Sequence, residues 1–276
     1  MNNSGTEPGI SETCDAFLGG RLQLFQPATG YRAGTDAMLL AAAYNVMSFG
    51  TVRVLDCGAG AGAVGLALAT RVEAASVVLV ERDPCFVALA RRNVTLNRLA
   101  DRVDVVEADV AAPLSACPSL LSRAGTFDHV LANPPYFEES QASRAASRLK
   151  RAAHTMRDGE YEDWARFAAA MLRPQGGVTL IVRVEMLTIV LAAMTRRFGA
   201  VRILPLQSNA RQPASRLLIN AIKGSRGPLA LLPALIVHDN GLEQLKHGDR
   251  QRGATRYSAE VEQILRYGAA LSWPKT

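Results

Sequence analysis

Short apolar segments recur along the chain, and most of them lack alternation between polar and apolar positions. That pattern is typical of β-strands covered on both faces. The segments that show it are residues 52–58, 76–83, 102–109, 127–135, 177–183, 201–206 and 215–224. Between them lie stretches with apolar residues at helical spacing, chiefly 36–47, 63–72, 85–97, 161–172 and 185–197. Strands that alternate with helices predict right-handed crossovers and a mostly parallel sheet, so we expect an α/β fold.

The last two predicted strands differ from the others in how they are connected. The polar segment QSNARQPA joins them and is too short for a helix of ordinary length. We therefore expect seven strands in a mostly parallel sheet, with an antiparallel pair at one edge. Asp36, after Thr35, is placed to cap the first predicted helix. The expected organisation is a flexible tail, one α/β domain and an extension packed on that domain, over residues 1–14, 15–225 and 226–276.

The composition is that of an ordinary globular protein, with 49% hydrophobic and 20% charged residues among 276. It excludes a wholly disordered chain. No apolar run reaches the roughly 18 residues that a membrane helix needs, and the first residues lack the basic and apolar regions of a secretion signal. We therefore expect a cytoplasmic protein with no membrane partner. Because cysteines and histidines form no CxxC motif or other metal-ligand spacing, no metal site or disulfide framework is predicted.

Positive charge is concentrated in the second half of the chain. Residues 1–130 carry ten Lys or Arg and thirteen Asp or Glu, whereas residues 131–276 carry 21 and 12. Residues 141–157 hold five basic residues and no acidic one, and residues 186–238 hold seven and none. One such stretch is as consistent with a solvated surface as with a nucleic-acid site, but two in one half favour a polyanionic partner. The RNA-binding candidates in the first stretch are Arg144, Arg148, Lys150 and Arg151.

A glycine-rich loop follows the first of the predicted strands. Asp56 lies at the end of this strand, and Gly58, Gly60 and Gly62 precede a predicted helix. Backbone N–H groups at such a helix start face a ligand that lies over the carboxyl end of the sheet. Because Gly65 completes a GxGxxG pattern, NAD has to be weighed as the ligand.

The charge of Asp56 separates the two candidate cofactors. A carboxylate at this position would repel a pyrophosphate but attract the amino group and the sulfonium of S-adenosylmethionine. The sequence therefore favours S-adenosylmethionine. Glu81, at the end of the next strand, is expected to accept hydrogen bonds from the ribose hydroxyls. Asp109, at the end of the third, is expected to meet the adenine amino group. For both acids the alternative is a helix cap.

The tetrad Asn133-Pro134-Pro135-Tyr136 ends the fourth predicted strand, where an open α/β sheet binds ligands. Two prolines make a stiff turn, which a simple strand end would also explain, but such a turn does not call for the flanking Asn and Tyr. The Asn133 side-chain oxygen and the Pro134 carbonyl can each accept one hydrogen of a planar NH₂ group. That arrangement directs the nitrogen lone pair toward a methyl donor and favours the positive charge that develops on nitrogen. Tyr136 supplies a face for stacking.

Together, Asp56-x-Gly58-x-Gly60 and the Asn133–Tyr136 tetrad resemble the class I S-adenosylmethionine-dependent N-methyltransferases, which modify exocyclic amines of adenine or cytosine, or glutamine amides. The segment LGGRLQLFQPATGYRAGTDAMLLAA, residues 18–42, narrows the resemblance to the bacterial tRNA(Val) adenine-N6 methyltransferase family, which modifies the adenine beside the anticodon. The resemblance covers most of residues 15–225 and implies a Rossmann-like fold. It also places a group of residues near the active site, namely Arg32, Gly34, Thr35 and Asp36. The chain departs from the family beyond residue 225.

Several functions remain open at this point. The leading one is methylation of adenine N6 in tRNA or another structured RNA. Methylation of a protein glutamine amide or of another base is the main alternative, because the tetrad recognises an NH₂ group and not the polymer that carries it. Small-molecule O-methylation would call for a metal or a base beside the hydroxyl, and NAD-dependent oxidoreduction for a proton donor. A non-catalytic RNA-binding protein that retains the fold would have no need for Asp56, Glu81 and the tetrad.

Overall fold

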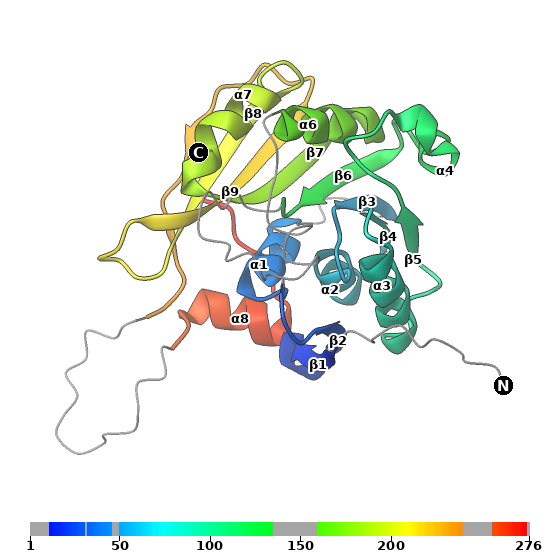
Figure 1. Ribbon diagram of the computed structural model, residues 1–276. Helices are drawn as coiled ribbons and strands as arrows, with labels where there is room; N and C mark the ends of the chain where they lie inside the picture. Colours follow the sequence, from blue (N-terminus) through cyan, green and yellow to red (C-terminus); the bar gives the residue numbers. More distant parts are fainter. Residues whose placement is uncertain (1–10, 31, 46–49, 135–158, 240–255, 275–276) are drawn as a thin grey trace, which may run out of the picture.

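The computed structural model describes residues 11–30, 32–45, 50–134, 159–239 and 256–274 (Figure 1). Its centre is a nine-stranded sheet in which β10, β8, β9, β7, β6, β3, β4 and β5 follow one another and β11 also pairs with β8. The strands are β3 (Val52–Cys57), β4 (Ala75–Glu81), β5 (Val103–Glu107), β6 (Phe127–Ala132), β7 (Leu172–Arg183), β8 (Phe198–Gln207), β9 (Ala214–Lys223), β10 (Ala230–Leu231) and β11 (Leu235–Ile236). All neighbouring pairs are parallel except those that β9 makes with β7 and β8.

Helices cover both faces of this sheet, which explains why its strands are apolar on both sides (Figure 1). One face packs against α1 (Thr35–Ala43), α2 (Ala63–Arg71) and α3 (Pro84–Leu96), and α8 (Ala259–Tyr267) packs in turn against α1. The other face packs against α4 (Pro118–Leu121), α6 (Glu160–Met171) and α7 (Leu187–Met194). Short 3-10 turns, η1 (Leu18–Gly20), η2 (Leu114–Ala116) and η3 (Val184–Met186), complete the described elements. None of the helices in this part of the chain is long and apolar enough to cross a membrane.

The predicted α/β class with a mostly parallel sheet is confirmed, and each predicted strand is present. Two details differ. The antiparallel strand β9 lies between β7 and β8, two positions inside the edge that β10 forms, because the chain turns back after β8 and inserts the next strand beside β7. The short strands β10 and β11 then add to the outer side of β8, which the sequence pattern did not show because each is only two residues long.

A hairpin before the first helix was not predicted. It consists of β1 (Glu12–Phe17) and β2 (Leu22–Pro27), which pair with each other and not with the central sheet. Residues 12–14, expected in the flexible tail, therefore begin a strand, while residues 1–10 lie outside the described part of the chain. Asn93 of α3 ties the hairpin to the domain, since its side chain accepts from the Phe25 N–H at 2.7 Å and donates to the Phe25 carbonyl at 3.0 Å.

The C-terminal extension packs on the same body as the rest of the chain. Helix α8 lies against α1 and η1, and its apolar residues Val261 and Ile264 are fully buried in the core on that face. After the helix, the Leu271 N–H donates to the Ala42 carbonyl at 2.9 Å and the Trp273 indole N–H to the Ala43 carbonyl at 2.8 Å. These bonds satisfy carbonyls at the C-terminal end of α1, which have no partner within their own helix.

Candidate functional site

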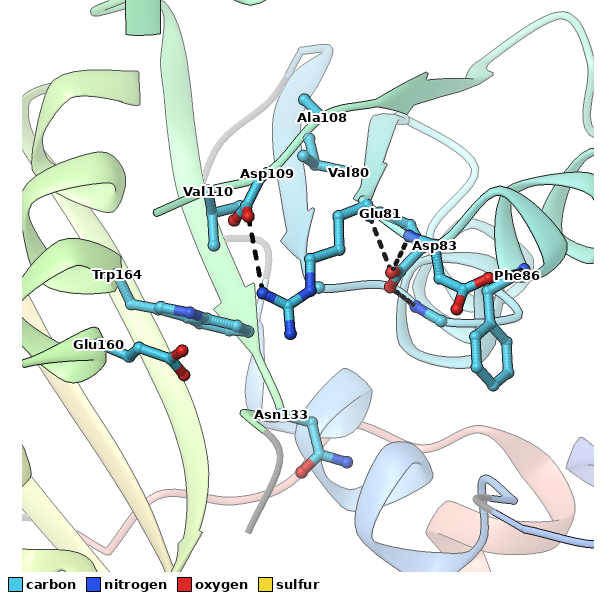
Figure 2. A pocket seen from close by; sticks show the side chains of 13 residues that line it. Val80, Glu81, Asp83, Phe86, Ala108, Asp109, Val110, Asn133, Glu160 and Trp164 are labelled. Atoms are coloured by element: carbon cyan, nitrogen blue, oxygen red, sulfur yellow. Dashed lines mark hydrogen bonds and ion pairs between the residues drawn. The ribbon is translucent and has the colours of Figure 1, made fainter. Parts of the chain in front are cut away.

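A pocket lies over the carboxyl ends of β3, β4, β5 and β6, where the sequence placed its candidate ligand (Figure 2). It encloses about 750 Å³ of empty space, including the part open to solvent. Its lining is Gly58, Gly60, Val80, Glu81, Arg82, Asp83, Phe86, Ala108, Asp109, Val110, Asn133, Glu160 and Trp164. The structure thus brings together residues from the glycine loop, from the ends of four strands and from α6.

Gly58 allows the closest contact in the site. Its φ of +69° favours glycine, and a Cβ atom there would lie 2.5 Å from the Trp164 ring of α6. The Trp164 ring therefore lies directly against the start of the glycine loop. It forms one wall of the pocket, together with Glu160 of the same helix (Figure 2). Any larger residue at position 58 would push this wall away from the loop.

The Glu81 carboxylate holds the loop in place. One of its oxygens accepts from the Gly60 N–H at 2.8 Å, and the other accepts from the Arg82 and Asp83 N–H groups at 2.8 Å each. An ionised carboxylate has about four lone-pair sites, so these three bonds leave room for about one more donor. One acceptor position on Glu81 thus stays available for a ligand, and its expected hydrogen bonds from the ribose hydroxyls stay a prediction.

Asp56 is the most deeply buried acid of the site, with 1% of its surface exposed. One of its oxygens accepts from the Gly65 N–H at 2.8 Å. Burial raises the pKa of this carboxyl to about 7, the Gly65 hydrogen bond opposes the shift, and the nearby Glu81 charge adds to it. Asp56 also lines a second cavity of about 370 Å³, together with Asn133 and Ala33. A cationic ligand group in this cavity would compensate the cost of the buried charge.

Asp109 lines the larger pocket and lies two residues after β5. One carboxylate oxygen accepts from the Ala111 N–H at 2.9 Å, and the other lies 3.6 Å from an Arg82 guanidinium nitrogen. Both side chains are over 40% exposed, at 42% and 44%. The local bond to Ala111 is the helix-cap-like role that the sequence left open, and the exposed second oxygen faces the pocket lining that includes Arg82.

Asn133 follows the last residue of β6 and lines both cavities. It is half-buried, and Pro134 after it is buried. The other two members of the tetrad, Pro135 and Tyr136, lie outside the described residues, as do the RNA-binding candidates Arg144, Arg148, Lys150 and Arg151. The amide of Asn133 therefore lies on the boundary between the pocket with Glu81 and Asp109 and the cavity with Asp56.

The residues placed near the site by resemblance border it without lining either cavity. Ala33 and Ala37, on the same segment, line the smaller cavity. Arg32 instead forms an ion pair with Asp15 of the hairpin at 2.6 Å. Gly34 precedes α1 as its N-cap residue, so the expected capping role of Asp36 is wrong. Thr35 and Asp36 contact residues from later parts of the chain. The Thr35 hydroxyl lies 3.4 Å from the Tyr257 hydroxyl, and the Asp36 carboxylate lies 3.0 Å from the Arg216 guanidinium.

The sequence pattern did not predict the residues that helices contribute to the pocket lining. Trp164 and Glu160 come from α6, and Phe86 comes from the first turns of α3. Their only sequence signal is helical spacing, which predicts that one face is buried but not that this face closes a ligand site. Arg82 was missed for a different reason, since an arginine next to an acid after a strand is a common surface pattern.

Comparison with known proteins agrees with this geometry. A family model described as the methyltransferase small domain matches residues 33–209. The chain belongs to this methyltransferase family. The sequence-based expectations of a Rossmann-like methyltransferase and of S-adenosylmethionine as its cofactor are thereby confirmed.

Three known proteins illustrate the range of similarity. A Porphyromonas gingivalis protein named tRNA1(Val) (adenine(37)-N6)-methyltransferase is 30% identical over 207 residues, which are 74% of this chain and 79% of the relative. A solved structure named as a predicted O-methyltransferase from Agrobacterium tumefaciens is 32% identical with a TM-score of 0.67, over 86% of this chain and 98% of that chain. The T. thermophilus 16S rRNA N2 G1207 methyltransferase, solved with AdoMet and guanosine, shares the fold alone at 21% identity and a TM-score of 0.50, over 80% of this methyltransferase and 53% of that chain.

The residues of the site fit the cofactor of this methyltransferase. The buried Asp56 carboxylate would complement a cationic amino group, and Gly58 of the glycine loop lines both the cavity with Asp56 and the larger pocket. Glu81 would supply an acceptor for a ribose hydroxyl, and Phe86 and Trp164 line the same pocket. The second acid, Asp109, offers an exposed oxygen at the far end of the same space.

Proposed function

We propose that this methyltransferase transfers a methyl group from S-adenosylmethionine to the N6 amino group of an adenine in tRNA. The observation that carries the proposal is the position of Asn133, which lines both the pocket with Glu81 and the cavity with Asp56. An acceptor held there would lie beside the cofactor. The name of the P. gingivalis relative, which is given as a tRNA adenine-N6 methyltransferase, supports this choice of base and polymer.

The proposed chemistry needs little from the protein besides placement. When bound, S-adenosylmethionine supplies an electrophilic methyl group on a positively charged sulfur. The Asn133 side-chain oxygen and the Pro134 carbonyl accept the two hydrogens of the adenine amino group and orient its lone pair. Both acceptors interact more strongly as the nitrogen becomes positive, so they stabilise the transition state more than the ground state. The proton can leave after the transfer, which removes the need for a strong base.

The distribution of charge supports RNA as the carrier of the base. Residues 131–276 hold 21 Lys or Arg against 12 Asp or Glu, and basic groups attract phosphates. The sequence candidates Arg148, Lys150 and Arg151 remain part of this proposal. Their joint replacement by Ala is expected to weaken RNA binding and its salt dependence, with cofactor affinity unchanged.

The experiment is incubation of the protein with methyl-labelled S-adenosylmethionine and, separately, total tRNA, rRNA, DNA and protein. Hydrolysis of each product and mass spectrometry then identify the labelled nucleoside or amino acid. We expect N6-methyladenosine from the tRNA sample. Label in glutamine, in another base or in no polymer at all would overturn the proposal.

O-Methylation is the second candidate, because the A. tumefaciens structure carries that name at 32% identity. A hydroxyl offers only one hydrogen, so it would leave one of the two proposed acceptors at Asn133 and Pro134 without a donor. The same assay decides between the two, since an O-methyl product on ribose or on a small molecule differs from N6-methyladenosine in its fragment mass.

A further inference from the structure

One surface beside the site has no role in the mechanism above. It is formed by Arg211, Arg216, His238, Arg256 and Tyr257, and we call it the hairpin surface because the β8–β9 hairpin carries two of its arginines. Figure 1 shows this hairpin extending beyond the body of the sheet. Its turn follows the carboxyl end of β8, so it lies at the same edge of the sheet as the candidate site.

The centre of the hairpin surface is a stacked pair of rings. The His238 and Tyr257 rings lie 5.1 Å apart at an interplanar angle of 22°. The two residues also form an antiparallel bridge, flanked by backbone bonds of 3.0 Å from the Asp239 N–H to the Arg256 carbonyl and 2.9 Å from the Ser258 N–H to the Val237 carbonyl. Both rings are half-buried and held by backbone structure, so they present a prearranged aromatic platform.

Two contacts connect this platform to the candidate site. The Tyr257 hydroxyl lies 3.4 Å from the Thr35 hydroxyl, and the Arg216 guanidinium lies 3.0 Å from the Asp36 carboxylate. Thr35 and Asp36 stand between Ala33 and Ala37, which line the smaller cavity with Asn133. The segment from Ala33 to Ala37 therefore contacts the hairpin surface through Thr35 and Asp36 and lines the cavity with Asn133 through its two alanines.

The charges of this surface are unevenly paired. Arg216 is bonded to Asp36, and the neighbouring Arg183 is paired with Glu185 at 3.2 Å. Arg211 and Arg256 are exposed, and the described part of the chain offers neither guanidinium an ion pair. Arg256 directly precedes the platform residue Tyr257, and Arg211 lies in the hairpin turn. Exposed guanidinium groups that flank an aromatic stack suit a ligand with alternating phosphates and flat bases.

We propose that the hairpin surface binds the unpaired RNA nucleotides that flank the target adenine. A flanking base stacks on the His238–Tyr257 pair, and Arg211 and Arg256 contact phosphates on either side of it. Unpaired nucleotides are required because a base inside a helix does not expose its face to a side chain. This inference rests on the proposed function, since it assumes that the acceptor base belongs to RNA.

The test compares two double variants with the same change in charge. Arg211→Glu with Arg256→Glu alters the hairpin surface, while Arg196→Glu with Arg226→Glu alters exposed arginines at the opposite ends of the same two strands. The probe is a fluorescent anticodon stem-loop RNA, whose affinity is measured by anisotropy at several salt concentrations. We expect the hairpin variant to bind on the order of tenfold more weakly, with a salt slope reduced by about 0.7 for each lost phosphate contact. The control variant should change affinity less than twofold.

The aromatic platform is tested by Tyr257→Ala and Tyr257→Phe. Loss of the ring is expected to weaken RNA binding about tenfold, whereas Phe keeps the stack and should bind like the unchanged protein. Affinity for S-adenosylmethionine, measured by calorimetry, should be equal in all variants and shows that each is folded. Equal RNA binding by the hairpin and control variants would overturn the inference.

Methylation of tRNA by the unchanged protein, assayed in parallel, separates the two proposals. If the unchanged protein methylates tRNA but the hairpin variants bind RNA as it does, only the hairpin surface is wrong. If the unchanged protein neither binds nor methylates RNA, the proposed function fails, and the hairpin surface fails with it.

Discussion

Asp56 is a buried acid whose burial disfavours the charge that the site needs. Its side chain is buried beneath the glycine loop, and its pKa is raised to about 7, chiefly by that burial. A carboxyl with this pKa is mixed between its two forms at neutral pH. We propose that the charged form attracts the cationic amino group of the cofactor, so that proton binding and cofactor binding would compete at this residue.

Cofactor affinity is therefore expected to depend on pH through Asp56. Below pH 7, each unit of acidification should weaken S-adenosylmethionine binding by about tenfold, because the neutral fraction of Asp56 grows by that factor. Above pH 8 the contribution of Asp56 should level off, and loss of the positive charge on the α-amino group of the cofactor, whose ordinary pKa is about 8, should weaken binding in turn. The Asp56→Asn variant should bind weakly and without this dependence. Calorimetric titrations from pH 5.5 to 8.5, a range chosen to span about one and a half units on either side of that pKa, measure both curves. An unchanged pH profile in the variant would contradict the assignment.

Asn133 carries the other residue-scale prediction. Its replacement by Ala removes one of the two proposed acceptors of the amino group but none of the contacts of Asp56 or Glu81. Methyl transfer should fall by about a hundredfold or more, which is typical for loss of a transition-state hydrogen bond, while the Kd for S-adenosylmethionine stays within about twofold. Single-turnover rates and calorimetry measure the two quantities. Full activity in this variant would discard the acceptor role.

At the scale of elements, α6 and α8 contribute in different ways. Helix α6 closes the pocket, because its Trp164 ring lies against Gly58 and its Glu160 lines the same space. Helix α8 has no residue in the pocket lining and acts through α1, against which it packs on the side away from the sheet. The segment from Ala33 to Ala37 thus depends on α8 for support, although the two are more than 220 residues apart along the chain.

Truncation of the buried face of α8 is expected to destabilise the whole domain. Ile264 is fully buried in the core that contains α1 and α2, so Ile264→Ala should lower the free energy of unfolding by about 2–5 kcal/mol. Arg266, on the same helix, has 66% of its side chain exposed. Arg266→Ala should therefore change the free energy of unfolding by less than about 1 kcal/mol. Urea unfolding measures both. A small effect of Ile264→Ala would contradict the inferred contribution of this buried side chain to the stability of the domain.

At the scale of the whole molecule, two buried titratable groups act on stability in opposite directions. His129 on β6 is 7% exposed, its ring nitrogen lies 2.8 Å from the Thr179 hydroxyl, and burial lowers its pKa to about 3. Between that value and its ordinary 6.5, the unfolded chain binds the extra proton, so stability rises with pH. Asp56 behaves oppositely between its ordinary 3.8 and about 7, where the folded chain holds the extra proton.

The contributions of His129 and Asp56 to the slope of unfolding free energy against pH are expected to cancel where their titration ranges overlap. Removing His129 by His129→Gln should change the slope of unfolding free energy against pH by about −1.4 kcal/mol per unit between pH 4 and 6.5. Asp56→Asn should change the slope by about the same amount with the opposite sign. Urea unfolding at half-unit pH steps in the absence of cofactor measures these slopes. Parallel curves for the unchanged protein and the two variants would contradict both assignments.

The order of strands and helices could be predicted from the sequence because it depends on local patterns. Apolar runs such as residues 76–83 and the helical spacing of residues 85–97 specify the type of each element. The candidate acids and Asn133 could be predicted as well, since they directly end strands and the carboxyl ends of parallel strands meet at one edge. This is why Asp56, Glu81, Asp109 and Asn133 converge on the pocket lining or the adjoining cavity.

Only the tertiary structure decided which distant residues complete this edge. Trp164 lies against Gly58 because α6 packs on the face of the sheet opposite α2. Thr35 contacts Tyr257 because the end of the chain returns to α1, and Asp36 contacts Arg216 of β9. Such contacts join residues that are about 100 to 220 positions apart, and nothing in a local pattern specifies them. The physical reason is that a local pattern selects the conformation of a segment, whereas its partner is selected by the shape and charge of surfaces that exist only after folding.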